Sequence, residues 1–154
     1  MSPDLASTGI LTADAVRLGL TAEDKLDALR QCGEVLVSIG AATQEYSAAI
    51  LEREESVSTY MGEGTAIPHG TDASRAHIKR AALAVLQFPD GVDWSGNQVQ
   101  LCVAIASRSD EHLTILQALA GVLSDSTKAR SLRETTSVDK VLELLAPEDE
   151  EDDE

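Results

Sequence analysis

Two apolar runs of strand length place the strongest limit on how this chain folds. Residues 81–88 read AALAVLQF and residues 99–107 read VQLCVAIAS. Near-continuous apolar runs are typical of strands buried on both faces, because side chains alternate between the two faces of a sheet. Turn-forming residues stand between the runs at 89–91 (PDG) and again at 96–97 (GN). The sequence therefore predicts two central strands with a covering layer on each side.

Segments with helical spacing flank these strands. Thr21 predicts the N-cap of a helix that ends near Gly40, with apolar residues on one face between them. The other predicted elements are a helix over 43–53, an edge or short strand at 65–67, and helices over 111–123, 124–133 and 137–145. Strands that alternate with helices favour an α/β fold, with a single mixed β-sheet covered by helices on both faces.

Length and charge define the domain and its class of partner. The 154 residues suit one domain, predicted over residues 1–147, and residues 148–154 form a tail of seven acids that we expect to be disordered. Removing these seven charges from the net charge of −15 leaves −8. An acidic body argues against nucleic acid as a ligand, because phosphate backbones need basic surfaces. It favours a basic protein partner.

The sequence also predicts a cytoplasmic protein. No apolar run approaches the ~20 residues that a membrane-spanning helix needs, so no membrane insertion is expected. The first residues, MSPDLASTG, lack the basic start of a signal peptide. Cys32 and Cys102 both stand among apolar residues, and we interpret them as reduced core residues.

A histidine in the segment GEGTAIPHGT, residues 62–71, is the first candidate for chemistry. Pro68 restricts the backbone that enters His69, and Gly70 lets the chain turn or lets a partner approach closely. An imidazole held this way suits a nucleophile, and near pH 7 much of it is neutral and able to attack. Alternatively, His69 is a turn histidine whose ring is merely hydrogen-bonded.

Three more residues carry chemistry that suits a phosphoryl group. His112 follows a buried strand and opens a helix, where backbone amides favour anions; alternatively it is an exposed residue at a helix start. Arg53 offers a planar fork of donors, or else a surface ion pair. Glu63 would accept a proton from a ring nitrogen and orient an imidazole, or it is a solvated loop acid. His77, which stands among basic residues, is interpreted as a surface residue.

Four segments, in this order, carry a resemblance to a known family. They are LEREESVSTYMGEGTAIPHGT, PDGVDW, IASRSDEHLTILQALAGVL and TTSVDKVLELLA. Together they resemble the mannitol-type enzyme IIA of the bacterial sugar phosphotransferase system, within the mannitol, fructose and nitrogen-regulatory IIA family. The likeness covers residues 10–145.

The resemblance implies a role for each candidate residue. His69 would be the histidine that accepts the phosphoryl group, and His112 would be the second histidine of the active site. Arg53 and Glu63 would correspond to the arginine and the acid that precede the acceptor in the family motif. The histidine-containing phosphocarrier HPr would donate to His69, which would pass the group to a cysteine of a mannitol-type enzyme IIB. Sugar is then phosphorylated during uptake, and this step needs no cofactor, metal or nucleotide.

Two other functions remain open from the sequence. The chain could be a fructose-type or nitrogen-type regulatory IIA, whose phosphorylation state controls a partner protein. It could also bind a metal through His69, His112 and Glu63, although zinc sites usually need three or four closely spaced ligands.

Overall fold

The computed structural model describes residues 11–56, 58–62, 64–107, 115, 117 and 119–145. In chain order its elements are η1 (Ala13–Ala15, a 3₁₀ helix), β1 (Val16–Arg17), α1 (Lys25–Ser38), α2 (Gln44–Ser56), β2 (Tyr60–Gly62), β3 (Thr65–Ala66), η2 (Asp72–His77, a 3₁₀ helix), β4 (Ala82–Trp94), β5 (Asn97–Ala106), α4 (Ser126–Glu134) and α5 (Val138–Leu144). Residues 119–123 are helical as well, within the helix predicted over 111–123, and the predicted tail lies outside the described residues.

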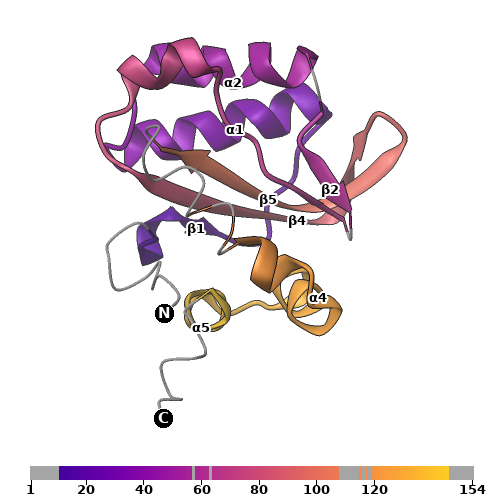
Figure 1. Ribbon diagram of the computed structural model, residues 1–154. Coiled ribbons are helices and arrows are strands. Elements are labelled where there is room, and N and C mark those ends of the chain that lie inside the picture. The colour runs from indigo at the N-terminus through magenta and orange to yellow at the C-terminus, as the bar shows by residue number, and fades with distance from the viewer. Residues whose placement is uncertain are drawn as a thin grey trace.

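The strands form one five-stranded sheet in the order β1-β4-β5-β3-β2 (Figure 1). β4 and β5 pair antiparallel as a long central hairpin. β1 runs parallel to β4, and β3 runs parallel to β5. β2 closes the other edge antiparallel to β3. The mixed sheet that the sequence predicts is confirmed.

Helices cover both faces of this sheet. α1 and α2 lie on one side, and α4 and α5 lie on the other (Figure 1). Along β4, Ala84 and Leu86 belong to the core beneath α1, whereas Leu83 and Val85 belong to the core on the opposite face. Both faces of this part of the strand are therefore buried, which explains the near-continuous apolar run at residues 81–88.

The first long helix begins later than predicted. Its N-cap is Asp24 rather than Thr21, and the Asp24 carboxylate accepts a hydrogen bond from the Asp27 backbone N–H at 2.9 Å. The Asp27 carboxylate in turn accepts from the backbone N–H of Glu23. This reciprocal pair satisfies two amides at the helix start, so it outcompetes the upstream threonine. At the other end Gly40 has φ 79°, as a helix-ending glycine requires.

The turn predicted at 89–91 is wrong. β4 continues through these residues, and residues 88–91 face residue 100 alone across the ladder. The Gln100 side chain donates to the Pro89 carbonyl at 3.0 Å and so bridges the irregular stretch. Proline and glycine are accommodated at this bulge because the regular hydrogen-bond ladder is already interrupted there.

The hairpin instead turns at residues 95–96, one residue before the second predicted site at 96–97. Ser95 and Gly96 have φ values of 55° and 97°, and they connect the paired residues Trp94 and Asn97. Two positive φ angles in a two-residue loop are the geometry that matches the twist of a hairpin. Trp94, the last residue of β4, is fully buried, and its indole N–H donates to Glu54 near the end of α2.

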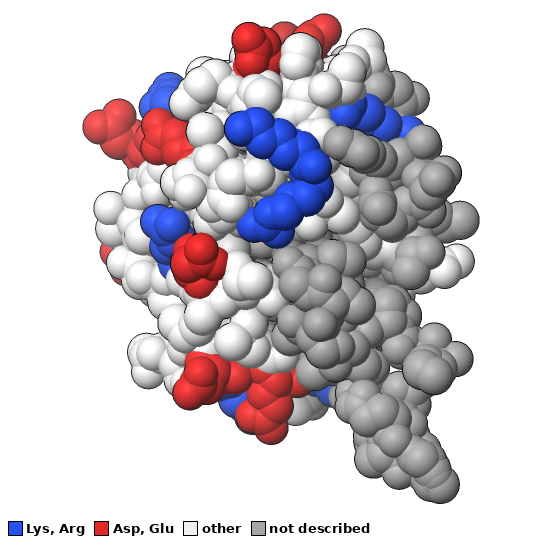
Figure 2. Space-filling view, turned by 90° about the vertical axis from the view of Figure 1, so that its left-hand side faces the viewer, with Lys and Arg blue, Asp and Glu red and all other residues white. Residues whose placement is uncertain are grey.

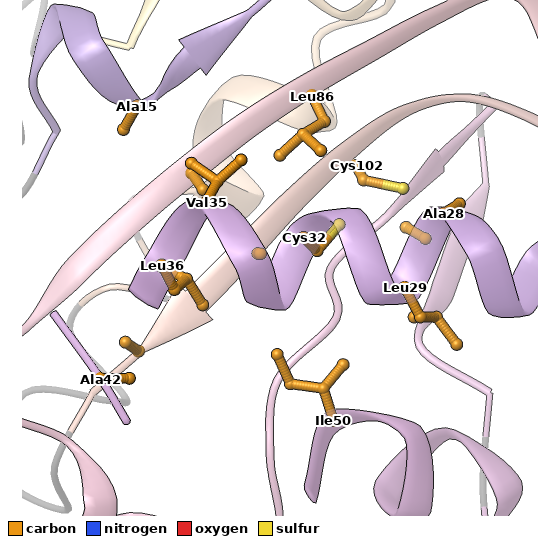
Figure 3. Packing of buried hydrophobic residues seen from close by; sticks show 14 of the residues in the cluster. Ala15, Ala28, Leu29, Cys32, Val35, Leu36, Ala42, Ile50, Leu86 and Cys102 are labelled. Carbon is orange, nitrogen blue, oxygen red and sulfur yellow. The ribbon is translucent and has the colours of Figure 1, made fainter. Parts of the chain in front are cut away.

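The two cysteines lie in the core between α1 and the sheet. Figure 3 shows Cys32 on α1 and Cys102 on β5, and both are buried and free. A hydrogen bond with the Cys32 thiol, together with burial, raises the pKa of the Cys102 thiol well above its usual value. The Cys102 thiol therefore stays protonated. That both cysteines are buried and free agrees with the sequence interpretation.

None of the helices in the described part of the chain has the length and apolar character to cross a membrane.

Candidate functional site

His69 lies on the side of the sheet to which the carboxyl ends of the parallel strands β3 and β5 point. After β3, the chain continues alongside β5, and His69 pairs with Ile105 as a parallel bridge. The Ile105 N–H donates to the Pro68 carbonyl at 2.8 Å, which fixes the residue before the histidine. In open α/β sheets the carboxyl ends of parallel strands are the usual place for ligands. The structure thus places His69 near the carboxyl ends of these strands, where a small anion is expected.

One ring nitrogen of His69 is committed to the backbone. Its Nδ1 lies 2.9 Å from the Ile67 carbonyl oxygen. Because a carbonyl only accepts hydrogen bonds, the geometry assigns the proton to Nδ1. In the neutral ring, Nε2 then carries the lone pair. This is the tautomer that nucleophilic attack through Nε2 needs. It is held by the carbonyl of Ile67, two residues earlier in the chain.

The surroundings of His69 favour its neutral form. Burial lowers the pKa of His69 most, and the hydrogen bond to Ile67 opposes this shift. The positive charges of Arg53 and Arg75 lower the pKa further, while the negative charge of Glu54 raises it, and the pKa is lowered overall. The imidazole is therefore mostly neutral at pH 7, which is the form that carries a free lone pair.

Two arginines from separate elements act on this imidazole. Arg53 comes from the last turn of α2, and Arg75 comes from η2. Figure 2 views the side on which η2 and the end of β5 lie in Figure 1, and it shows Lys and Arg side chains adjoining one another there. The structure brings together the predicted residues Arg53 and His69 and adds Arg75, which the sequence interpretation missed. The only sequence signal for Arg75 is its basic segment, SRAHIKR.

A buried tyrosine hydroxyl locks the turn after His69. Tyr46 Oη accepts a hydrogen bond from the Gly70 N–H at 2.9 Å and donates to the Ile105 carbonyl at 2.7 Å. A Cβ at Gly70 would lie 2.5 Å from both the Tyr46 ring and the Ser74 hydroxyl. Gly70 is therefore required for close packing against α2 and η2, and the tyrosine ties that packing to β5.

We expect Tyr46→Phe to lower the free energy of unfolding by about 1–3 kcal/mol, because the buried Gly70 N–H would lose its acceptor. Urea unfolding followed by the fluorescence of Trp94, the single tryptophan, measures the change. Tyr60→Phe is the matched control, since it removes the other tyrosine hydroxyl from a half-buried strand position. Equal losses in the two variants would contradict the role assigned to the Tyr46 hydroxyl.

A buried carboxylate next to Arg53 is the second feature that the sequence interpretation missed. Glu54 is 5% exposed. It accepts hydrogen bonds from the Thr59 N–H and hydroxyl and from Trp94 Nε1, at 2.6–3.2 Å. Lys25 Nζ lies 3.1 Å from the same carboxylate. A signal was present in the sequence, because residues 46, 50 and 54 share one helical face and the first two are apolar or aromatic.

Acid should weaken the fold through Glu54. Burial would raise the pKa of this carboxyl, but the hydrogen bonds from Thr59 and the charge of Lys25 outweigh burial and lower it. A lowered pKa gives stability that is present above the unfolded value of about 4.3 and is lost as the pH falls through the folded value. We expect Glu54→Gln to flatten this acid dependence in urea unfolding. Glu52→Gln, which removes a charge from the exposed face of α2, is the control, and an equal effect of both would refute the assignment.

Two predicted site residues fall outside the described part of the chain. These are His112 and Glu63, so both stay predictions. His77 is half-buried at the end of η2, where its carbonyl accepts the Thr43 N–H.

Comparison with known proteins places the chain in a family. The model for "Phosphoenolpyruvate-dependent sugar phosphotransferase system, EIIA 2" matches residues 9–147. The mannitol-specific phosphotransferase enzyme IIA component of Staphylococcus aureus (strain Mu50) is 34% identical over 91% of this chain and 97% of its own length. The PTS system mannitol-specific EIICBA component of Pasteurella multocida is 39% identical over 88% of this chain, but the match spans only 22% of that protein.

Solved structures agree with this placement. The crystal structure of IIA mannitol from Escherichia coli superposes with a TM-score of 0.81 and 38% identity, over 88% of this chain and 98% of that one. A complex of enzyme IIAMTL and phosphorylated enzyme IIBMTL from Escherichia coli matches with the same TM-score and 36% identity, over 87% of this chain and 95% of that one. On the family match, the chain belongs to the EIIA 2 family of the phosphoenolpyruvate-dependent sugar phosphotransferase system.

Proposed function

We propose that this protein is a cytoplasmic phosphocarrier of the mannitol type. It accepts a phosphoryl group from phosphorylated HPr on His69 and passes it to a cysteine of a mannitol-type enzyme IIB. The observation that carries the proposal is the His69 ring, whose Nδ1 is bound to the Ile67 carbonyl within the field of two arginines. The resemblance to a IIAMTL that is solved in complex with phosphorylated IIBMTL supports an enzyme IIB as the partner in transfer.

The first transfer step needs only one reactive atom from this chain. The lone pair of His69 Nε2 attacks the phosphorus of the donor phosphohistidine. A new N–P bond forms while the donor N–P bond breaks, and the His69 proton stays on Nδ1, hydrogen-bonded to the Ile67 carbonyl. No net proton moves, because the donor imidazole keeps the electron pair of the broken N–P bond and His69 Nε2 supplies the pair of the new one.

Positive charge near His69 supports this chemistry. The transition state of phosphoryl transfer spreads negative charge over the three non-bridging oxygens, so catalysis comes mainly from positioning and electrostatic stabilisation. Arg53 supplies a fork of donors, and Arg75 supplies a second positive charge nearby. In the proposal, His112, the second active-site histidine that the family resemblance implies, helps to position the phosphoryl group, and the Glu63 carboxylate orients an imidazole.

The second step reverses the roles. A thiolate of enzyme IIB attacks the phosphorus, a P–S bond forms, and the P–N bond to His69 breaks with its electron pair returning to Nε2. The hydrogen bond from Nδ1 to Ile67 again keeps the proton in place, so His69 is ready for the next donor.

Incubation with phosphorylated HPr, followed by mass analysis of proteolytic fragments, tests the proposal. We expect one phosphoryl group on the fragment that contains His69. Addition of a mannitol-type enzyme IIB should then discharge it faster than a fructose-type enzyme IIB does. A protein that stays unmodified would refute the phosphocarrier function, and faster discharge to the fructose-type partner would refute the mannitol assignment.

A further inference from the structure

We infer that Glu54 is a positioning residue that holds Arg53 in place beside His69, through hydrogen bonds that join the end of α2 to three other parts of the chain. The inference deepens the proposed phosphocarrier function and rests on it, because it concerns the electrostatic stabilisation of the transferred group. It assigns no contact between Glu54 and the phosphoryl group itself.

The carboxylate of Glu54 is where four segments meet. Thr59 lies in the connection to β2, Trp94 ends β4, and Lys25 begins α1. The Thr59 hydroxyl donates at 2.6 Å and the Trp94 indole N–H donates at 3.0 Å. Lys25 Nζ lies 3.1 Å from the carboxylate and 5.3 Å from the centre of the Trp94 ring. The last turn of α2 is thereby fixed against the hairpin and α1.

Arg53 gains its position from this anchor. It precedes Glu54 in the same helical turn, and its charge acts on the His69 imidazole. Helix ends fray when nothing holds them. If the last turn of α2 loosened, the backbone of Arg53 would move with it, and displacements of about 1 Å cost as much as 100-fold in rate.

Stability alone does not account for a carboxylate at this position. A buried ion pair is often no more stabilising than a well-packed apolar pair of similar volume. A carboxylate with donors on several sides instead selects one arrangement of the groups around it. Because Glu54 is adjacent to Arg53 in the chain, we interpret this fixed arrangement as a requirement for the position of Arg53.

A double-mutant cycle on the rate of phosphoryl uptake from phosphorylated HPr tests this inference. We expect Glu54→Gln to slow uptake about 10- to 100-fold in the otherwise unchanged protein. In the Arg53→Gln background the same change should slow uptake less than about twofold, because residues that act as a unit are not additive. An equal slowing in both backgrounds, or none in either, would overturn the inference.

Milder variants keep the test valid if Glu54→Gln folds poorly. Trp94→Phe and Thr59→Val each remove one donor to the carboxylate and leave the Glu54 and Arg53 side chains intact. Each should slow uptake, again only when Arg53 is present. Gln87→Leu is the matched control: it removes a buried polar group that bonds Gly19 and Thr135 on the opposite face of the sheet. It should slow uptake equally in both backgrounds or not at all.

A second measurement separates this inference from the proposed function. The pKa of His69 is followed by NMR in the protein without any phosphoryl donor. Arg53→Gln removes a charge that lowers this pKa, so the pKa should rise. The rise should be smaller when Glu54→Gln has already displaced Arg53. An equal rise in both backgrounds overturns the role of Glu54 even if His69 takes up the phosphoryl group, and the smaller rise supports it even if His69 takes up none.

Discussion

A His69→Ala protein is expected to take up no phosphoryl group from phosphorylated HPr, under conditions in which the unchanged protein becomes fully modified. The reason is that the imidazole supplies the only nucleophilic lone pair in the proposed reaction, and its Nδ1 is committed to the Ile67 carbonyl at 2.9 Å. Removing a covalent nucleophile abolishes the reaction instead of slowing it. Phosphate labelling and mass analysis both measure the loss.

The control for this experiment is His77→Ala. His77 is the half-buried histidine at the end of η2, and it has no part in the proposed transfer. It should therefore leave the rate of uptake unchanged. Stable labelling of the His69→Ala protein at any other residue, His112 included, would show that the acceptor has been assigned to the wrong side chain.

The sheet could be predicted because burial leaves a direct mark on sequence. The runs at 81–88 and 99–107 are almost entirely apolar because both faces of β4 and β5 pack against helices. Very short strands leave a weaker mark: the strand predicted at 65–67 is found as β3, but two others gave no signal. β1 has two residues and β2 has three, and their pairing depends on the strands beside them. They were therefore not predicted.

The prediction of a turn at 89–91 failed for a related reason. Proline, aspartate and glycine are turn formers by local preference. Here the partner strand continues past them, and tertiary pairing overrides the preference by absorbing the extra residues as a bulge. Local signals were reliable where no partner competed, as at Gly40 and at Ser137, whose side chain caps α5 by accepting the Lys140 N–H.

The candidate site shows the same difference between local signals and contacts between distant residues. The rigidity of the segment around His69 is local, and Pro68 and Gly70 signalled it in the sequence. The contacts that hold the residues around His69 in place are not local. Tyr46 reaches Gly70 across 24 positions in the chain, and Trp94 reaches Glu54 across 40. Partners at such separations leave no spacing signal in a single sequence, so these contacts required the structure.

Replacement of Arg53 is the second change for which we expect a large effect. Arg53→Gln should slow phosphoryl uptake by about 100- to 1,000-fold, which is typical for the loss of one group that stabilises transition-state charge. Its charge already acts on the His69 imidazole in the resting protein. As the phosphoryl group arrives, that charge would meet the developing negative charge on the oxygens. Rapid-quench measurement of labelled protein gives the rate.

Arg53→Lys distinguishes charge from geometry at the same position. Lysine keeps the positive charge but loses the planar fork of donors, so we expect a rate between those of the unchanged protein and Arg53→Gln. Arg130→Gln is the matched control, because it removes an exposed arginine from α4, a helix on the opposite face of the sheet from α2. If Arg53→Lys matched the unchanged protein, a point charge would suffice, and bidentate recognition of the phosphoryl group by Arg53 would be refuted. If Arg53→Gln and Arg130→Gln slowed uptake equally, the effect would come from net charge, because only a residue beside His69 should affect transfer more than a distant arginine does.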